Sequence, residues 1–145
     1  MNELTVDIVQ AKWFEKLPPL RLRTCWSLFS VALLMFYAIV GMVSFAMHGP
    51  DGLVASTIAA AVCWLGASVA LAGTAYFGRS GTNGPLYTLA FGLLFNGALP
   101  FSVGLALNRA GGAVADAGVF GLSIVFLQFA LVVETLFSLC LLKHR

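Results

Sequence analysis

The sequence predicts an all-α integral membrane protein: a four-helix bundle with a short amphipathic helix at the membrane interface before it. Hydrophobic residues make up 60% of the chain, charged residues 10%, and the mean hydropathy is +0.95. A soluble domain of 145 residues cannot bury so much apolar surface. The apolar residues also form four separate stretches. At ~1.5 Å per residue, each stretch is long enough to cross a hydrocarbon layer of ~30 Å.

Residues 1–20 are expected to form the amphipathic arm. Apolar side chains recur there at spacings of three and four, while charged residues fall mostly elsewhere around the helix, a pattern typical of an interfacial helix. The apolar positions are Val6, Val9, Trp13 and Leu17. Pro18 and Pro19 end the helix, because proline has no N–H for a helical hydrogen bond.

The remaining residues, 21–145, form the predicted membrane domain. Its four spans are expected at 26–47, 53–77, 86–107 and 119–142. The connections between them are rich in glycine and polar residues, which is typical of turns outside the lipid. They are HGPDG (48–52), GRSGTNG (78–84) and NRAGGAVAD (108–116).

Two spans carry small residues at helical spacing. Small residues let membrane helices approach closely, so these faces are expected to pack against other helices of the bundle or to bind a partner helix. In the second span the face includes Ala60, Cys63, Ala67 and Ala70. In the third span it includes Gly92, Pro100 and Gly104. Pro100 is expected to free the carbonyl group of Asn96 and to disturb the helix there.

The basic residues predict the orientation of the bundle. With four spans, the two termini and the second loop share one side of the membrane. Of the eight Lys and Arg residues, all but Arg109 fall on that side. By the positive-inside rule both termini are expected in the cytoplasm, and the protein in a bacterial plasma (inner) membrane. The net charge of +2 is too small to indicate binding to nucleic acid.

Glu134 is the candidate functional residue, because it is the one acidic or basic side chain in the four stretches. A carboxylate at this depth costs several kcal/mol unless protein or water shelters it. Asn96 lies ~15 Å in from the expected cytoplasmic end of the third span. Glu134 lies ~12 Å in from the cytoplasmic end of the fourth span, so the two residues are at similar depth. Antiparallel neighbours would bring the two side chains together as an intramembrane polar pair. Lesser candidate partners of the acid are Gln128, Thr135 and Ser138.

No motif indicates catalysis, a metal or a cofactor. The sequence has no nucleophile next to a base and no phosphate-binding loop. Cys25, Cys63 and Cys140 are scattered without metal-binding spacing, so they are expected to be apolar packing residues. The protein is therefore expected not to be an enzyme, and its expected partners are lipid and other membrane helices.

Part of the chain resembles a known family. TLAFGLLFNGALPFSVGLAL (88–107) and FLQFALVVETLFSL (126–139) look like the second half of ATP synthase protein I. GPDGLVASTIAAAVCWLGASVAL (49–71) resembles the small-residue-rich second helix of that family. The resemblance implies a small four-helix protein that helps to assemble the ring of c subunits of the F-type ATP synthase. Some family members have been linked to magnesium supply.

The chain also departs from the family pattern. Where the third helix of the family commonly has an acid followed by a basic residue, this chain has Leu93 and Asn96. An ion-conducting role carried over from the family is weakened by this loss, whereas a packing or assembly role is not. Two further hypotheses stay open. One is a small proton or magnesium carrier, or a rotor-like proteolipid, that uses Glu134; the other is a membrane bundle of some different role.

Overall fold

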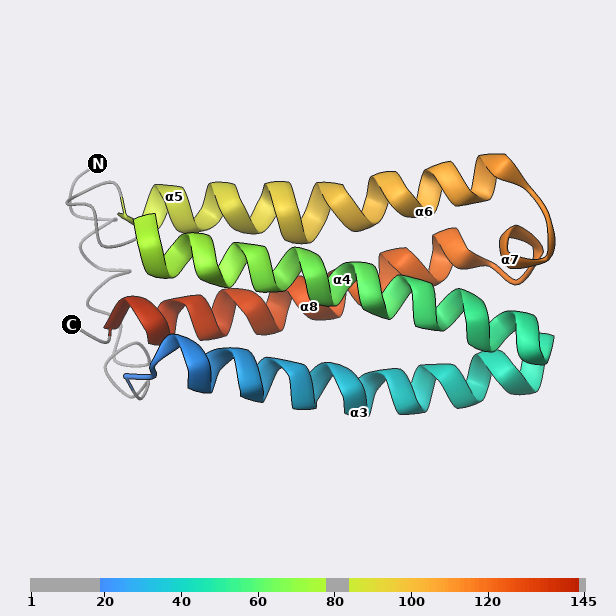
Figure 1. The fold of residues 1–145 in the computed structure, drawn as a ribbon, viewed down its shortest axis with the longest axis horizontal. Helices are drawn as coiled ribbons and strands as arrows, with labels where there is room; N and C mark the ends of the chain where they lie inside the picture. The colour runs from blue at the N-terminus through green and yellow to red at the C-terminus, as the bar shows by residue number, and fades with distance from the viewer. Residues whose placement is uncertain (1–18, 78–83, 144–145) are drawn as a thin grey trace, which may run out of the picture.

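The computed structural model describes residues 19–77 and 84–143, and these residues form a bundle of long helices (Figure 1). Its elements are α3 (Leu22–His48), α4 (Pro50–Phe77), α5 (Gly84–Phe91), the π-helix η2 (Gly92–Ala98), α6 (Leu99–Ala110), α7 (Ala113–Asp116) and α8 (Val119–Lys143). The expected all-α class is confirmed, since no strand occurs in the described part of the chain. The amphipathic helix expected before the bundle lies outside the described residues.

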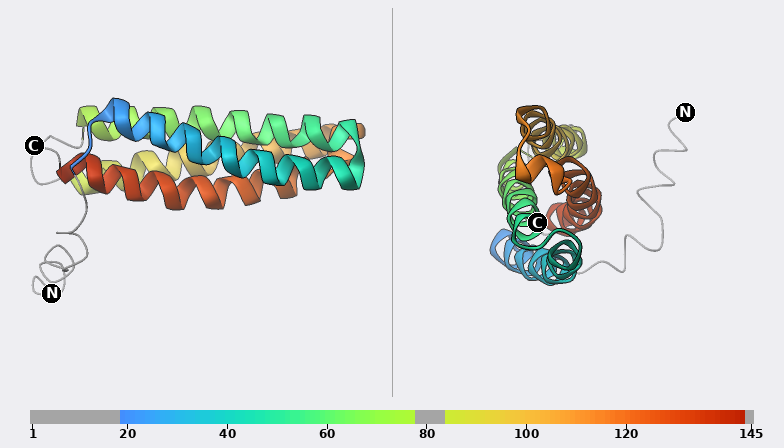
Figure 2. Two further views of the ribbon diagram at one scale, coloured as in Figure 1. Left: turned by 90° about the horizontal axis from the view of Figure 1, so that it is seen from below. Right: turned by 90° about the vertical axis from the view of Figure 1, so that its right-hand side faces the viewer.

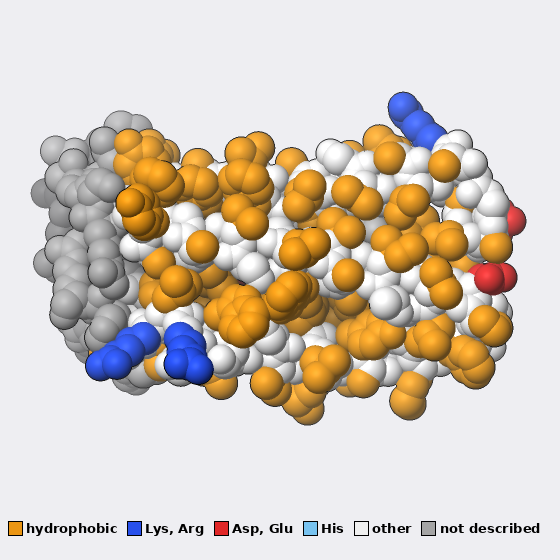
Figure 3. All heavy atoms as spheres, viewed as in Figure 1, with side chains coloured by type: hydrophobic (Ala, Val, Ile, Leu, Met, Phe, Trp, Pro, Cys, Tyr) orange, Lys and Arg blue, Asp and Glu red, His pale blue; other side chains and the backbone are white. Residues whose placement is uncertain are grey.

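Four helices are long and apolar enough to cross a membrane. They cover Leu22–His48, Pro50–Phe77, Leu86–Ala110 and Val119–Leu141. Consecutive spans run in opposite directions and lie alongside one another, as the views from below and from the end show (Figure 2). Side chains on the outside of the bundle are largely apolar, and on the face drawn the Lys and Arg side chains lie only toward its two ends (Figure 3). The chain is therefore a multi-pass membrane protein.

The second span, α4, is the centre of the bundle, and it packs against α3, α8 and every element of the third span. Its small residues face inward: Cys63, Ala67 and Ala70 are completely buried, and Ala60 is half-buried. They meet larger side chains of the flanking helices, including Phe29 of α3 and Phe126 of α8. Helices with small side chains at the contact can come close enough for dispersion to hold them together.

The first turn is shorter than the loop expected at 48–52. Gly49 alone separates α3 from α4, with φ 66°, a conformation that residues other than glycine rarely adopt. Pro50 begins α4, where its fixed φ suits a helix and its missing N–H costs nothing. Asp51 and Gly52 consequently lie in the first turn of α4 rather than in the loop.

The third span is one continuous rod made of three elements. Seven residues in its middle, Gly92–Ala98, form a π-helix, and α-helix continues on both sides. In a π-helix each carbonyl bonds to the N–H five residues further on. For Phe95 that residue is Pro100, which has no N–H. The disturbance expected from Pro100 therefore accompanies a widened turn just before it, and this turn faces α4 and α8.

Candidate functional site

Glu134 lies inside the bundle, on α8 where that helix faces the third span. Its side chain is only 1% exposed. The hydroxyl of Ser138, one turn further along α8, donates a hydrogen bond of 2.6 Å to Oε1. The other carboxylate oxygen, Oε2, faces Gly92, and a Cβ atom built on that glycine would lie only 3.2 Å from it. Gly92 thus leaves the space that the carboxyl group occupies.

Asn96 follows Gly92 by four residues and is completely buried. Its amide lies toward the Glu134 carboxyl, near enough to act on its charge. However, neither Oδ1 nor Nδ2 has a hydrogen-bond partner among the described residues. A buried amide left without a partner costs about 1–3 kcal/mol. The structure therefore brings the two predicted side chains into one polar site but leaves the amide unsatisfied.

Close packing of the third span on α4 fixes the position of this site. The carbonyl oxygen of Phe95 lies directly against Gly66, and a Cβ atom on Gly66 would overlap it. Asn96 is the next residue, and its Cα lies 3.5 Å from the same Cβ position. A glycine on α4 and a widened turn on the third span thus hold the Asn96 backbone against the centre of the bundle.

A cavity of about 140 Å³ adjoins the acid on the flank of the bundle, between the third span and α8. An apolar cavity of ~150 Å³ holds a molecule the size of benzene. Besides Glu134, the polar side chains that line the cavity are Thr88 and Thr135. Its other lining residues are Leu89, Gly92, Leu93, Leu131 and Leu139. The Glu134 side chain is therefore almost inaccessible to solvent, yet it lines a cavity that opens on the flank of the bundle.

The other residues expected at the site have different surroundings. Gly104 is buried against α8, and a Cβ atom there would come within 2.7 Å of Ser123. Pro100 is buried in the first turn of α6. Ala60, Cys63, Ala67 and Ala70 belong to the internal seam of α4 described above. Among the lesser candidates, Ser138 contacts the acid, Thr135 is exposed at the cavity, and Gln128 is exposed away from it.

A second polar cluster joins α3 to α4 and was not expected from the sequence. The indole N–H of Trp26 donates to Ser68, and that of Trp64 donates to Ser30, each at 2.9 Å. Each serine also donates to the carbonyl oxygen of the tryptophan four residues before it in its own helix. The signal in the sequence is a Trp-x-x-x-Ser pattern present once in each of the two helices.

The described residues contain no group of three or more His, Cys, Asp and Glu side chains that could hold a metal ion. Cys25, Cys63 and Cys140 form no disulfide bond, and all three are buried, as expected for packing residues. The polar groups found together at Glu134 are thus its own carboxyl group, the Ser138 hydroxyl group and the Asn96 amide.

Comparison with models of known protein families, with curated proteins and with solved structures finds no match for this chain.

Proposed function

We propose that this chain is a non-enzymatic membrane protein that helps to assemble or stabilise the membrane sector of an F-type ATP synthase, in particular the ring of c subunits. The resemblance in the sequence supports this role. It includes the stretches 49–71, 88–107 and 126–139, and the last two of these hold Asn96 and Glu134. The proposed partner is therefore a membrane helix of a c or a subunit.

One observation carries the proposal: the buried acid lies in the wall of a cavity that opens on the flank of the bundle. A helix that is itself embedded in the membrane can approach this flank without leaving the lipid. Leu89 and Leu93 border the cavity and are 58% and 56% exposed. These leucines would contact an arriving helix, whose side chain could enter the cavity and reach Glu134. The small residues of α4 are not available for this purpose, because they pack within the chain.

The proposed location is the bacterial plasma membrane, with both termini in the cytoplasm. Arg21 and Arg23 lie at the start of the first span, at the end of the bundle where α8 finishes. Asp51 lies in the first turn of α4 and Asp116 just before α8, both at the opposite end, where Arg109 is the one Lys or Arg side chain among the described residues. This distribution supports a cytoplasmic position for the arginine-rich end.

Blocking the cavity tests the proposal. Leu93→Trp places a bulky ring at its border, and Val31→Trp places the same ring on α3, far from this cavity, at a position that is 57% exposed. Deleting the gene should lower the amount of assembled c-ring in the membrane, measured on native gels. The Leu93→Trp protein should give the same loss, whereas Val31→Trp should keep the normal amount. An unchanged c-ring after deletion would contradict the assembly role.

An ion carrier is the second candidate function. The buried amide beside the acid favours it, because carboxylate and amide oxygens are ligands that hard cations take. The cavity beside the acid is lined by residues of 88–93 and 131–139, which lie in one half of each span. A carrier also needs a path by which the ion reaches Glu134 from the opposite side of the membrane. Uptake of protons or magnesium into liposomes separates the two functions: a flux that disappears in the Glu134→Ala protein favours the carrier, and no flux favours assembly.

A further inference from the structure

The unsatisfied amide of Asn96 is the starting point. Buried amides almost always find a hydrogen-bond partner, and exceptions need an explanation. Asn96 is completely buried, so bulk water does not reach it. Neither atom of its amide is bonded within the described chain. A bound cation would pair with the Oδ1 atom of this amide and so remove the part of the penalty that belongs to the acceptor.

The side chains around Asn96 offer oxygen atoms from two adjacent helices. Glu134 contributes a carboxylate, of which Oε2 faces Gly92 and is free of the Ser138 hydrogen bond. Ser138 donates a hydrogen bond to Oε1 and thereby holds the carboxylate in this orientation. Asn96 Oδ1 is a further acceptor. Hard cations take oxygen ligands of these kinds.

Charge decides which kind of cation suits the site. Glu134 is the one acidic or basic side chain in the middle of the bundle among the described residues, because Arg23, His48, Asp51 and Arg109 lie near the ends of their spans. One carboxylate inside a membrane is neutralised by one positive charge. A divalent ion would leave an uncompensated positive charge in the low dielectric.

We propose that Glu134 and Asn96 bind a monovalent alkali cation, for which sodium is the probe, through Oε2 of the carboxylate and Oδ1 of the amide. The ion would lie between the carboxylate and the amide, on the side of Glu134 that faces Gly92. The adjoining cavity has room for water molecules that complete its coordination, since a water in the liquid occupies ~30 Å³. Thr88 and Thr135 place polar groups along that cavity. The cation site is independent of any role in ATP synthase assembly, and binding requires no transport.

Thermal unfolding of the purified full-length protein in detergent tests the site. The protein is prepared without sodium and titrated with sodium chloride or with choline chloride at equal ionic strength and constant pH. The unfolding midpoint should rise with the logarithm of the sodium concentration, because a ligand that binds only the folded state stabilises it. Choline should not raise it. Equilibrium dialysis with radioactive sodium should give one ion per chain.

Two variants and a control separate binding from a purely structural role. Glu134→Gln should lose both the sodium response and the bound ion. Asn96→Leu should lose the response as well, yet in sodium-free buffer it should be at least as stable as the natural protein, because it removes the unsatisfied amide. Ser44→Ala changes a buried serine of α3 near the Gly49 turn and should respond normally. A midpoint that ignores sodium, an equal rise with choline, or a full response in Glu134→Gln would overturn the site.

Discussion

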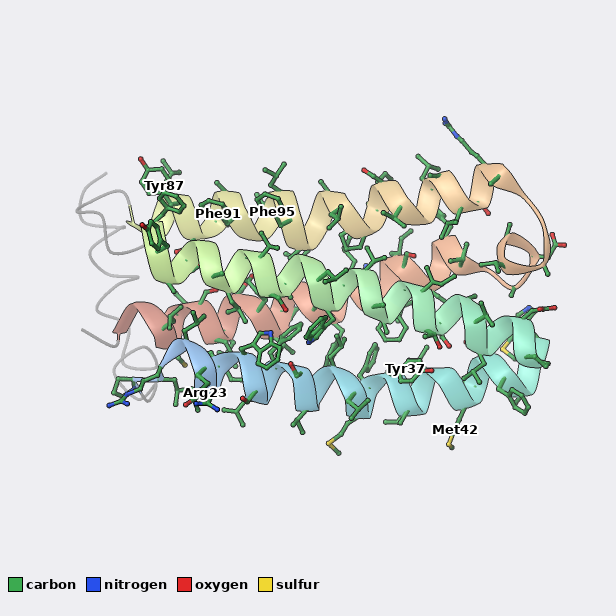
Figure 4. All side chains as sticks on the ribbon, in the orientation of Figure 1. Arg23, Tyr37, Met42, Tyr87, Phe91 and Phe95 are labelled. Carbon is green, nitrogen blue, oxygen red and sulfur yellow. The ribbon has the colours of Figure 1, made fainter. Side chains whose placement is uncertain are left out.

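At the scale of single residues, glycines decide how closely the third span approaches its neighbours. Gly66 leaves room for the Phe95 carbonyl oxygen, and Gly92 leaves room for the carboxyl group of Glu134. A Cβ atom on Gly73 would come within 2.8 Å of the Phe91 ring. In Figure 4 the Phe91 and Phe95 side chains project from one side of the same span. Each of these glycines therefore holds a contact that a single methyl group would disturb.

Gly66→Ala should lower the free energy of unfolding by about 1–3 kcal/mol, the usual cost of overpacking a close contact. The added Cβ overlaps a backbone atom, which cannot move without shifting the helix. Gly121→Ala is the matched control, because nothing lies within 4 Å of its Cβ position in α8. It should lose no stability and can gain up to about 1 kcal/mol, because alanine favours a helix over glycine. Unfolding of both variants by a denaturing detergent measures the difference. Equal free energies of unfolding for the two variants would contradict this prediction, because they would show that the third span can move away from α4 without loss of stability.

At the scale of elements, the two Trp-x-x-x-Ser patterns form a pair of reciprocal hydrogen bonds between α3 and α4, here called the Trp–Ser clasp. The helices run antiparallel, so the tryptophan of each one meets the serine of the other. The Trp26 and Trp64 ring centroids lie 5.6 Å apart, within the range of favourable aromatic pairs. A third bond joins Tyr37 to Thr57, further along the same pair of helices. These bonds fix the rotation of α3 against α4.

Ser30→Ala should weaken this clasp, because it removes the acceptor of the Trp64 indole N–H. Hydrogen bonds between membrane helices contribute about 0.6 kcal/mol on average and up to about 1.7 kcal/mol. Ser27→Ala is the control in the same helix, since the Ser27 hydroxyl bonds only to the Arg23 carbonyl oxygen of its own turn. Detergent unfolding should show a loss in this range for Ser30→Ala and almost none for Ser27→Ala. A similar loss in both would assign the effect to helix propensity instead of the clasp.

The third span shows how far a sequence predicts an element. Its length and its apolar character follow from composition, and Pro100 marks an irregularity. The type of irregularity does not follow, because a proline is compatible with a kink, a 3₁₀ turn or a π-helix. Packing selects the π-helix: the wider turn presses Phe95 and Asn96 against α4 while Gly92 faces Glu134.

At the scale of the whole molecule, the described charged side chains other than the buried Glu134 divide between the two ends and leave an apolar belt between them. Such a belt matches the hydrocarbon layer of a membrane. The hydrogen bond from Leu20 N–H to the Cys140 carbonyl oxygen ties the start of the first span to the end of the fourth. The described chain therefore enters and leaves the belt at the same end, as an even number of spans requires.

Cysteine labelling in intact cells should reveal the orientation. The native cysteines are buried, so they give little background. Asn108→Cys places a thiol at the exposed end near Arg109, and Thr24→Cys places one near the exposed Arg23. A maleimide that cannot cross the membrane should label only Asn108→Cys until the cells are permeabilised. Labelling of Thr24→Cys alone would reverse the proposed orientation.

The sequence by itself determined the class, the spans and the acid within them, because hydropathy and the rise of a helix per residue are local properties. It also placed Asn96 and Glu134 at similar depth. Only the tertiary structure decided that the small residues of α4 are used within the chain, that the Asn96 amide is left without a partner, and that a cavity adjoins the acid. These features depend on how each helix is rotated about its axis. One residue changes that rotation by about 100°, and a π-helix shifts it partway along a span. No local pattern in the chain fixes a rotation that neighbouring helices set together.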